Sequence, residues 1–264
     1  MMLFSGRENA NTEDGECPVS DVRVTYEADG ALAVLTIDRP HARNAISLGT
    51  MDLLNAALDE VFASRAKALV ITGAGDKAFV SGGDLKELAL LRTEEEAADM
   101  ARRMRSICDR IAGFPGPVVA ALNGHALGGG AEFSVAADIR VACDDIRIGF
   151  NQVTLAIMPA WGGAERLAAL VGKGRALMLA GSGTILTADD ALKFGLLDVV
   201  VPRASFEDEW RSLATKLASG AADEIKRVIA GVTPQEAISA FAKLWAHDDH
   251  WAAADKVMAR VSKS

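Results

Sequence analysis

Near the start of the chain, apolar and polar residues alternate in a way that predicts a β-hairpin. Val22, Val24 and Tyr26 are separated by polar residues, and residues 31–37 repeat the pattern of a strand. An Asp-Gly pair at residues 29–30 lies between the two runs and is typical of a tight turn. We therefore expect two antiparallel strands at the opening of the domain.

A helix and a buried strand are predicted next. Met51, Leu54 and Leu58 fall on one helical face, and acidic and amide side chains occupy the opposite face. The apolar run at residues 68–72 is short enough to be a buried strand. The pattern therefore continues as strand, helix, strand.

A second helix is predicted over residues 93–111. Thr93 and Glu96 form a capping-box pattern at its start, in which each side chain bonds the other residue's backbone N–H. Met104 and Ile111 belong to an apolar stripe at helical spacing, which is ordinary core.

The middle of the chain repeats the alternation of strand and helix. Residues 117–122 and 139–142 are apolar runs typical of buried strands, and a helix is expected over residues 128–137, after a glycine turn. Strands that alternate with helices predict the α/β class.

The last hundred residues favour helices. From residue 165 onward the pattern is mostly helical, with one strand expected over residues 196–201. Residues 234–260 carry Phe241, Trp245 and Trp251. So much apolar surface on terminal helices indicates packing against another subunit.

Composition and charge narrow the class of protein. A chain of 264 residues, half of them apolar, can bury a large core. Its formal net charge of −8 repels nucleic acid, and its apolar runs are far shorter than the roughly 20 residues of a membrane span. We expect neither nucleic acid nor membrane as a partner.

The chain divides into three expected parts. Residues 1–21 are acidic and lack the pattern of a signal or transit peptide, so we expect a disordered leader and a cytoplasmic protein. Residues 22–200 form the expected catalytic core, and residues 201–264 the helical C-terminal extension. The three cysteines, Cys17, Cys108 and Cys143, are widely spaced and are interpreted as reduced thiols.

Two glycine turns are the strongest candidates for chemistry. Residues 79–85 and 123–132 each join a strand to a glycine turn, and residues 128–130 are consecutive glycines. Such turns leave backbone N–H groups bare for an anion or a developing oxyanion. The alternative is that the glycines only allow a helix to pack closely on a strand. Glu132, a carboxylate among apolar neighbours, favours a functional reading, because such a group is expensive to bury unless it is used or paired.

Two other kinds of site are rejected. Gly73 and Gly75 follow a strand, but the third glycine of a dinucleotide fingerprint is missing and a strand follows in place of a helix. The four histidines lie in different segments or lack a third ligand, so no metal site is expected. Surface or packing roles are the default for them.

Five motifs in order resemble the crotonase superfamily, which comprises enoyl-CoA hydratases and isomerases. The resemblance runs from about residue 22 to the C-terminus. The motifs are DRPHARNA at residues 38–45, AFVSGGDL at residues 78–85, PVVAALNG leading into GGGAE within residues 117–132, PAWGG at residues 159–163 and ALKFGL at residues 191–196.

The resemblance implies a fold and a site. The fold is a spiral of strand–strand–helix turns with a helical C-terminal extension, assembled into trimers that often pair into hexamers. The backbone N–H groups of Gly83 and Gly129 correspond to the oxyanion hole that holds the thioester oxygen of an acyl-CoA. No cofactor is implied, because coenzyme A is part of the substrate. The residues implied to contact substrate or CoA are Arg43, Ala45, Ser81, Gly83, Asp84, Leu85, Lys86, Gly129, Pro159 and Trp161, with Phe241 and Arg260 reaching the CoA of a neighbouring subunit.

One position departs from the family's pattern. Hydratases of the family hold and activate a water with two glutamates; the first matches Glu132, and counting back from Pro159 places Gln152 at the second. Glutamine can position water but cannot exchange a proton near neutral pH.

Several functions stay open at this point. The commonest is hydration of a trans-2-enoyl-CoA, with Glu132 as base and Gln152 as a neutral holder of the water. The alternative is decarboxylation of methylmalonyl- or ethylmalonyl-CoA, since the GGGAEF and PAWGG runs are similar to the ethylmalonyl-CoA decarboxylase branch, which also lacks the second glutamate. Double-bond isomerisation and a noncatalytic CoA-binding role rank lower. The acyl chain is not determined.

Overall fold

Two sheets make up the body of the protein. The computed structural model describes residues 20–261, with element boundaries as follows. The strands are β1 Val22–Glu27, β2 Leu32–Ile37, β3 Ala68–Gly73, β4 Ala78–Val80, β5 Val118–Leu122, β6 His125–Leu127, β7 Ile139–Cys143, β8 Arg147–Gly149, β9 Ile185–Thr187 and β10 Val199–Val201. The six-stranded sheet has the order β1-β2-β3-β5-β7-β10, and the four-stranded sheet has the order β4-β6-β8-β9.

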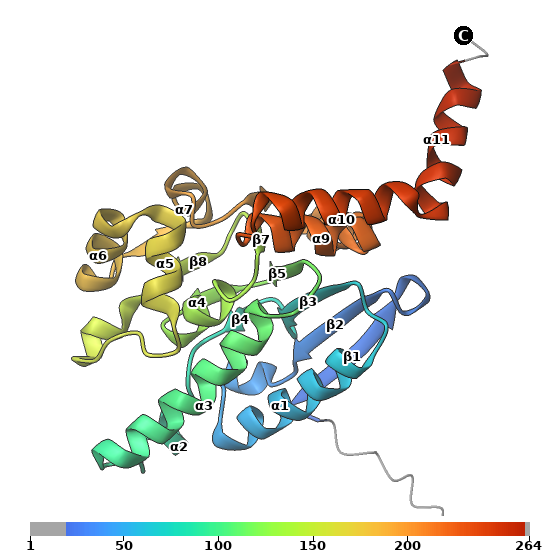
Figure 1. Cartoon of the computed structure of the whole chain (residues 1–264). Helices are drawn as coiled ribbons and strands as arrows, with labels where there is room; N and C mark the ends of the chain where they lie inside the picture. The colour runs from blue at the N-terminus through green and yellow to red at the C-terminus, as the bar shows by residue number, and fades with distance from the viewer. Residues whose placement is uncertain (1–19, 262–264) are drawn as a thin grey trace, which may run out of the picture.

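Eleven α-helices occupy the described part of the chain (Figure 1). They are α1 Leu48–Ala63, α2 Leu85–Leu88, α3 Glu94–Ala112, α4 Gly129–Ser134, α5 Gly163–Val171, α6 Lys173–Ser182, α7 Ala188–Phe194, α8 Phe206–Leu217, α9 Gly220–Ile229, α10 Pro234–Ala246 and α11 Asp248–Val261. Short 3-10 turns are η1 Ala28–Gly30, η2 Pro40–Ala42, η3 Asn151–Leu155 and η4 Arg203–Ser205. No helix within residues 20–261 is both long enough and apolar enough to cross a bilayer.

The element order repeats a strand–strand–helix unit. β3, β4 and α3 form one unit, β5, β6 and α4 the next, and β7, β8 and α5 a third. In each unit the first strand joins the large sheet and the second joins the small sheet. The expected α/β spiral is thereby confirmed.

Most predicted elements are present. The opening hairpin pairs Val22 with Ile37 and Glu27 with Leu32, and the capping box of Thr93 and Glu96 starts α3. The helix expected over residues 128–137 is shorter, Gly129–Ser134. The last predicted strand is also shorter, Val199–Val201, because Leu196 and Leu197 lie buried in the turn before it.

Of the strands in the small sheet, the sequence predicted β4 and did not predict β6, β8 or β9. The strands β6, β8 and β9 have three residues each. Three residues are too few to show an alternation of period two. β4 also has three residues, but all of them are apolar, whereas β6, β8 and β9 each include a polar residue. They form because longer strands and helices bring their backbones together.

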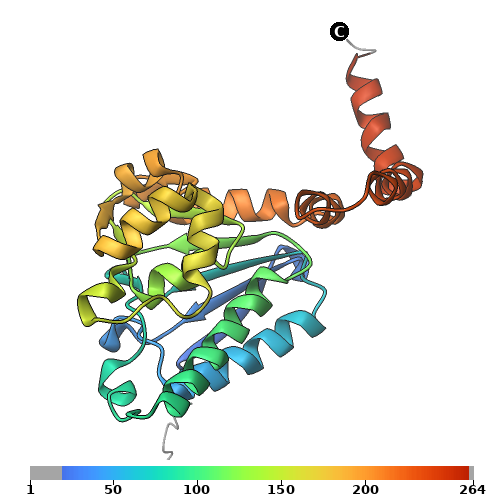
Figure 2. The same ribbon diagram turned by 60° about the vertical axis from the view of Figure 1, so that its left-hand side comes forward.

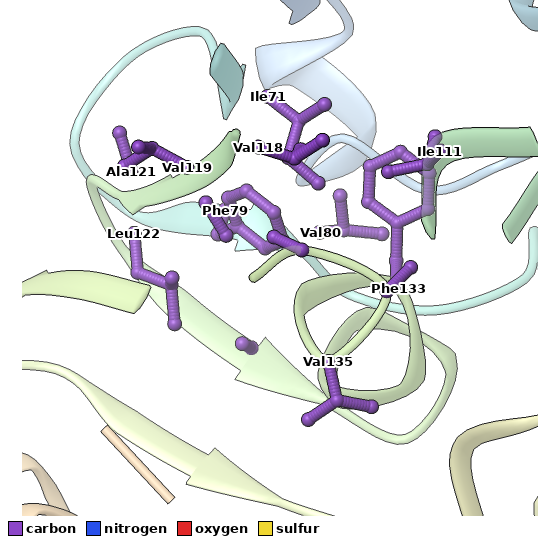
Figure 3. Close-up of a cluster of buried hydrophobic side chains, with 14 of the residues drawn as sticks. Ile71, Phe79, Val80, Ile111, Val118, Val119, Ala121, Leu122, Phe133 and Val135 are labelled. Carbon is purple, nitrogen blue, oxygen red and sulfur yellow. The ribbon is translucent and has the colours of Figure 1, made fainter. Parts of the chain in front are cut away.

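The core fills the space between the two sheets and the helices. Figure 3 shows side chains from β3, β4, β5, α3 and α4 meeting in one cluster, in which the rings of Phe79 and Phe133 lie 6.0 Å apart between centroids. Phe79, Val80 and Phe133 are fully buried. This packing fixes α4 against β4, and so fixes the glycine turns that precede α4 and follow β4.

The C-terminal helices leave the body. Figures 1 and 2 show α9 and α10 extending beyond the large sheet and α11 projecting away from it. Phe241, Trp245 and Trp251 are 62%, 49% and 46% exposed, and their rings form a cluster with His250. Residues 1–19 of the predicted leader (residues 1–21) lie outside the described residues, and Cys17 is among them.

Candidate active site

The fold brings the two glycine turns side by side. β4 and β6 are parallel neighbours in the small sheet, so their carboxyl ends lie at the same edge. β4 leads into Gly82 and Gly83, and β6 leads into Gly128 and Gly129. A Cβ atom built on Gly82 would lie 3.3 Å from the backbone nitrogen of Gly129.

The glycines of the second turn serve different purposes. Gly128 has a φ of 56°, in the left-handed region that favours glycine. A Cβ on Gly130 would lie 1.7 Å from the carbonyl oxygen of Val80, so Gly130 allows α4 to pack on β4. The packing interpretation is therefore correct for Gly130. Gly129 faces the indole ring of Trp161 instead.

Two backbone N–H groups at this edge are bare. Among the hydrogen bonds of residues 20–261, the N–H of Gly128 donates to Gly149 at 2.8 Å, but none is donated by the N–H of Gly83 or Gly129. Gly129 is the first residue of α4, where an N–H has no acceptor within the helix. With only six residues, α4 contributes the bare N–H of Gly129 and little macrodipole, and the N–H of Gly83 comes from the turn after β4.

Glu132 lies one turn beyond Gly129 and is almost completely buried, with 2% of its surface exposed. Its Oε2 accepts hydrogen bonds from the N–H of Trp161 at 2.7 Å and of Gly163 at 3.0 Å. Its Oε1 accepts from Gln152 at 2.7 Å and from the N–H of Ala160 at 3.3 Å. The carboxylate has no cationic hydrogen-bond partner among these groups.

Burial dominates the proton affinity of Glu132. Removal from water raises the pKa of its carboxyl group, and the hydrogen bonds from Trp161, Gly163, Ala160 and Gln152 oppose that rise without cancelling it. A carboxyl group with a raised pKa exchanges protons more readily near neutral pH.

Gln152 lies beside Glu132, as the count back from Pro159 predicts. It is buried in η3, where its Nε2 donates to Oε1 of Glu132. Its Oε1 has no hydrogen-bond partner among the protein groups of residues 20–261. A buried amide oxygen that no protein group satisfies is available to a bound molecule.

The loop at Pro159 and Trp161 closes the site from one side. Pro159 is buried, and the indole of Trp161 is 5% exposed. A Cβ on Gly129 would lie 2.3 Å from Cζ3 and 2.4 Å from Cη2 of that ring. The indole therefore lies directly against the second glycine turn.

The residues expected to wall the CoA form one strip. The N–H of Ser81 donates to the carbonyl of Arg43 at 3.2 Å, and the N–H of Asp84 donates to the carbonyl of Ile46 at 2.8 Å. Ala45 is buried within the strip. The strip thus runs alongside the first glycine turn, with Arg43 in the left-handed conformation at a φ of 54°.

Asp84 has a structural partner that the sequence did not reveal. Arg39 donates to Asp84 at 3.2 Å and also to the carbonyl of Ala45 at 2.5 Å. Asp84 caps α2 by accepting from the N–H of Lys86 at 3.2 Å. Arg39 belongs to the first family motif, so that signal was present but was not assigned to a site.

Leu85 and Lys86 are exposed at the outer end of the strip, where they face solvent. Leu88, which no motif indicated, lies nearer the site: a Cβ on Gly83 would be 2.4 Å from its Cδ1. Phe241 and Arg260 are not brought to the site of their own chain, because α10 and α11 project from the body (Figure 2).

Other reactive groups do not join this site. Burial raises the pKa of Cys108 to about 12 and of Cys143 to about 11, so neither thiol is a ready nucleophile. Within residues 20–261 there is no group of three or more histidine, cysteine or acidic side chains arranged to hold a metal ion. The chemistry available is that of two N–H groups, one carboxyl group and one amide.

Comparisons with known proteins agree with this geometry. The sequence profile of the enoyl-CoA hydratase/isomerase family matches residues 27–247. A short-chain-enoyl-CoA hydratase of Clostridium acetobutylicum is 36% identical over 204 residues, which are 77% of this chain and 78% of the relative. A crotonyl-CoA hydratase of Syntrophomonas wolfei is 36% identical over 197 residues, 74% of this chain and 75% of the relative. The crystal structure of an enoyl-CoA hydratase from Bacillus anthracis superposes with a TM-score of 0.78 at 33% identity, covering 86% of this chain and 90% of that one.

Proposed function

Since this chain belongs to the enoyl-CoA hydratase/isomerase family, we propose that it adds water across the double bond of a trans-2-enoyl-CoA. The observation that carries the proposal is the pairing of buried Glu132 with Gln152 beside two bare glycine N–H groups. The amide oxygen of Gln152 has no protein partner within residues 20–261. The two reactants are then water and the enoyl-CoA thioester, and no cofactor enters the reaction.

The N–H groups of Gly83 and Gly129 form the proposed oxyanion hole. When water adds to C3 of the enoyl group, negative charge develops on the thioester oxygen as the enolate forms. Two donors fixed by the backbone need no rearrangement at that moment, and each contributes about 3–4 kcal/mol of transition-state stabilisation. Backbone donors serve this purpose without side chains, which explains the glycines.

Glu132 carries the protons in this proposal. It accepts a proton from the attacking water, and the same proton then returns to C2 of the enolate, so that the elements of water add to the two carbons. Glu132 already accepts four hydrogen bonds, so one of these donors must release its bond when the carboxylate takes up the proton. The longest bond, from the N–H of Ala160 at 3.3 Å, is the first to open.

Gln152 holds the water in this proposal. Its Nε2 keeps Glu132 in place and its free Oε1 accepts a hydrogen bond from the water. The relatives named as short-chain-enoyl-CoA and crotonyl-CoA hydratases support this reaction class.

Decarboxylation of methylmalonyl- or ethylmalonyl-CoA is the second candidate. One observation favours it: a neutral amide, not a second carboxylate, faces the reacting space beside Glu132. A substrate carboxylate meets less repulsion there, and the same oxyanion hole stabilises the enolate left by carbon dioxide.

One assay separates the two candidates. Crotonyl-CoA, methylmalonyl-CoA and ethylmalonyl-CoA are each mixed with the protein, and the conjugated thioester absorbance and the release of carbon dioxide are followed. We expect the absorbance of crotonyl-CoA to fall and no carbon dioxide to appear. Release of carbon dioxide from either malonyl-type substrate, with crotonyl-CoA unchanged, would establish the second candidate.

The assembly proposed with this function is a homotrimer or a pair of trimers, in which α9, α10 and α11 pack on neighbouring subunits. The exposed apolar side chains of these helices support it, among them Ile229 at 80% and Phe241 at 62% exposure. Phe241 and Arg260 then approach the CoA of a neighbour. Analytical ultracentrifugation tests the assembly, and a monomer at micromolar concentration would contradict it.

A cytoplasmic location stays a prediction.

A further inference from the structure

We propose that the indole of Trp161 sets the length of the acyl group, so that the site accepts short enoyl chains and excludes long ones. The inference rests on the proposed function, since it concerns the substrate of the same site. Trp161 is then a specificity-determining residue that acts by occupying space, and Glu132 remains the group that moves protons.

The position of the ring carries the inference. One edge of its six-membered ring spans both glycine turns: Cζ3 and Cη2 lie 2.3 and 2.4 Å from a Cβ built on Gly129, and Cζ2 lies 3.8 Å from a Cβ built on Gly83. The Cδ1 atom of Leu88 lies 2.4 Å from the same point on Gly83. An indole and a leucine side chain thus line the space next to both proposed oxyanion donors.

That space is where the acyl chain must go. A thioester oxygen held by Gly83 and Gly129 places C1 beside both turns, and the chain must then run toward Glu132, because water adds at C3. The backbone N–H of Trp161 donates to Glu132, and the indole of the same residue lies against Gly129, one turn before Glu132, so the indole and the carboxylate lie at the same end of α4. Carbons beyond the reacting ones meet the indole or Leu88.

The ring is held too firmly to move aside without loss. The backbone of Trp161 is fixed at both ends, by its N–H on Glu132 at 2.7 Å and by its carbonyl, which accepts from Arg166 at 3.1 Å. The side chain is 5% exposed. Swinging it outward would expose a large apolar ring to water, and shifting its backbone would remove donors from a buried carboxylate.

The test compares chain lengths by binding and by turnover. Dissociation constants are measured for butyryl-CoA and decanoyl-CoA, which are saturated and are not hydrated, and kcat/KM for crotonyl-CoA and trans-2-decenoyl-CoA. We expect the unaltered protein to favour the four-carbon ligand on the order of tenfold or more, and Trp161→Ala to lose most of that preference, since a few methylenes in a closed pocket contribute effects of this size. The affinity for coenzyme A alone should not change.

Companion variants keep the test decisive. Trp161→Phe retains a smaller ring and should give an intermediate preference, and Leu88→Ala opens the other wall and should also favour the longer chain. They replace Trp161→Ala if that variant fails to fold. Leu53→Ala, a leucine truncation on the exposed side of α1, is the matched control and should keep the original preference.

The outcomes separate the inference from the function on which it rests. If the unaltered protein binds both acyl-CoA lengths equally, or if the preference survives in Trp161→Ala, Trp161→Phe and Leu88→Ala alike, the inference fails and the proposed function stands. If neither acyl-CoA binds to the unaltered protein, the proposed function itself fails.

Discussion

Two charged side chains lie buried in adjoining segments of this chain, and their surroundings differ. Glu132 on α4 and Arg140 on β7 are 2% and 1% exposed. Arg140 pairs with Asp198 at 2.5 Å and donates to the carbonyls of Leu196 and Ala137 at 2.8 and 2.9 Å. In the part of the chain that the structure describes, the donors to Glu132 are all uncharged N–H groups.

The difference separates a structural charge from the charge that we propose acts in catalysis. The guanidinium of Arg140 joins β7 to the turn between α4 and β7 and to the turn before β10, and an opposite charge compensates its burial. Glu132 is stabilised by dipoles alone, so burial raises its pKa and leaves its proton exchangeable. Substitutions at the two sites should therefore affect different quantities.

Among these changes, Glu132→Gln should have the largest effect, and the quantity that it lowers is turnover. Loss of the group that we propose carries the protons should lower kcat for crotonyl-CoA by about 10²–10⁴-fold. The affinity for butyryl-CoA should stay within a few-fold, because in the proposed binding mode the nucleotide and pantetheine contact other residues. The amide also points N–H groups at backbone N–H donors, so urea unfolding is measured alongside. A variant that folds and retains full turnover would remove Glu132 from the mechanism.

Asp198→Ala should show the opposite signature. It leaves the guanidinium of Arg140 buried without its counter-charge, which lowers the free energy of unfolding; because the Asp198 side chain is 40% exposed, we expect about 2–3 kcal/mol in place of the larger loss for a fully buried pair. Urea denaturation measures this loss, and kcat of the folded variant should be unchanged. Asp189→Asn, an exposed acid of α7, is the control and should change stability by less than about 0.5 kcal/mol. A large fall in kcat for Asp198→Ala would contradict the purely structural role of the pair of Arg140 and Asp198.

Gln152→Glu sharpens the comparison by giving Glu132 a charged neighbour. The Nε2 of Gln152 is 2.7 Å from Oε1 of Glu132, so two carboxyl groups would meet there and share a proton. If hydration is the native reaction, the second acid should raise crotonyl-CoA turnover, by about tenfold or more where the geometry is right. If decarboxylation is native, the variant should lose activity on methylmalonyl- and ethylmalonyl-CoA. Unchanged rates on every substrate would mean that residue 152 does not face the acyl group.

The pH dependence should show the smallest effect. Glu132 must be ionised to accept a proton from water, so kcat/KM should fall as the pH is lowered through its raised pKa, at a higher pH than for an ordinary glutamate of pKa 4.5. The folded protein binds this proton more tightly than the unfolded chain does. The binding of this proton therefore stabilises the folded protein fully at pH values below the ordinary glutamate pKa. This stabilisation is lost as the pH rises through the pKa of Glu132 in the folded protein. A pH series of kcat/KM and of urea unfolding tests both, and Glu132→Gln should abolish the trend in unfolding.

Local sequence determined the parts of the fold that local interactions specify. The hairpin of β1 and β2, the capping box of α3 and the apolar faces of α1 and α3 each depend on residues within a few positions of one another. The order of the five motifs was sufficient for the family, and the spacing between Pro159 and Gln152 was sufficient to place an amide beside Glu132.

Tertiary structure decided what depends on distant segments. The strands β6, β8 and β9 are too short to leave a pattern, and only pairing with their neighbours makes them strands. The partners of Arg140, the free oxygen of Gln152 and the indole of Trp161 against Gly129 all arise where segments far apart in the chain meet. Side-chain contacts across such distances depend on how the core packs, and no periodicity along one segment contains that information.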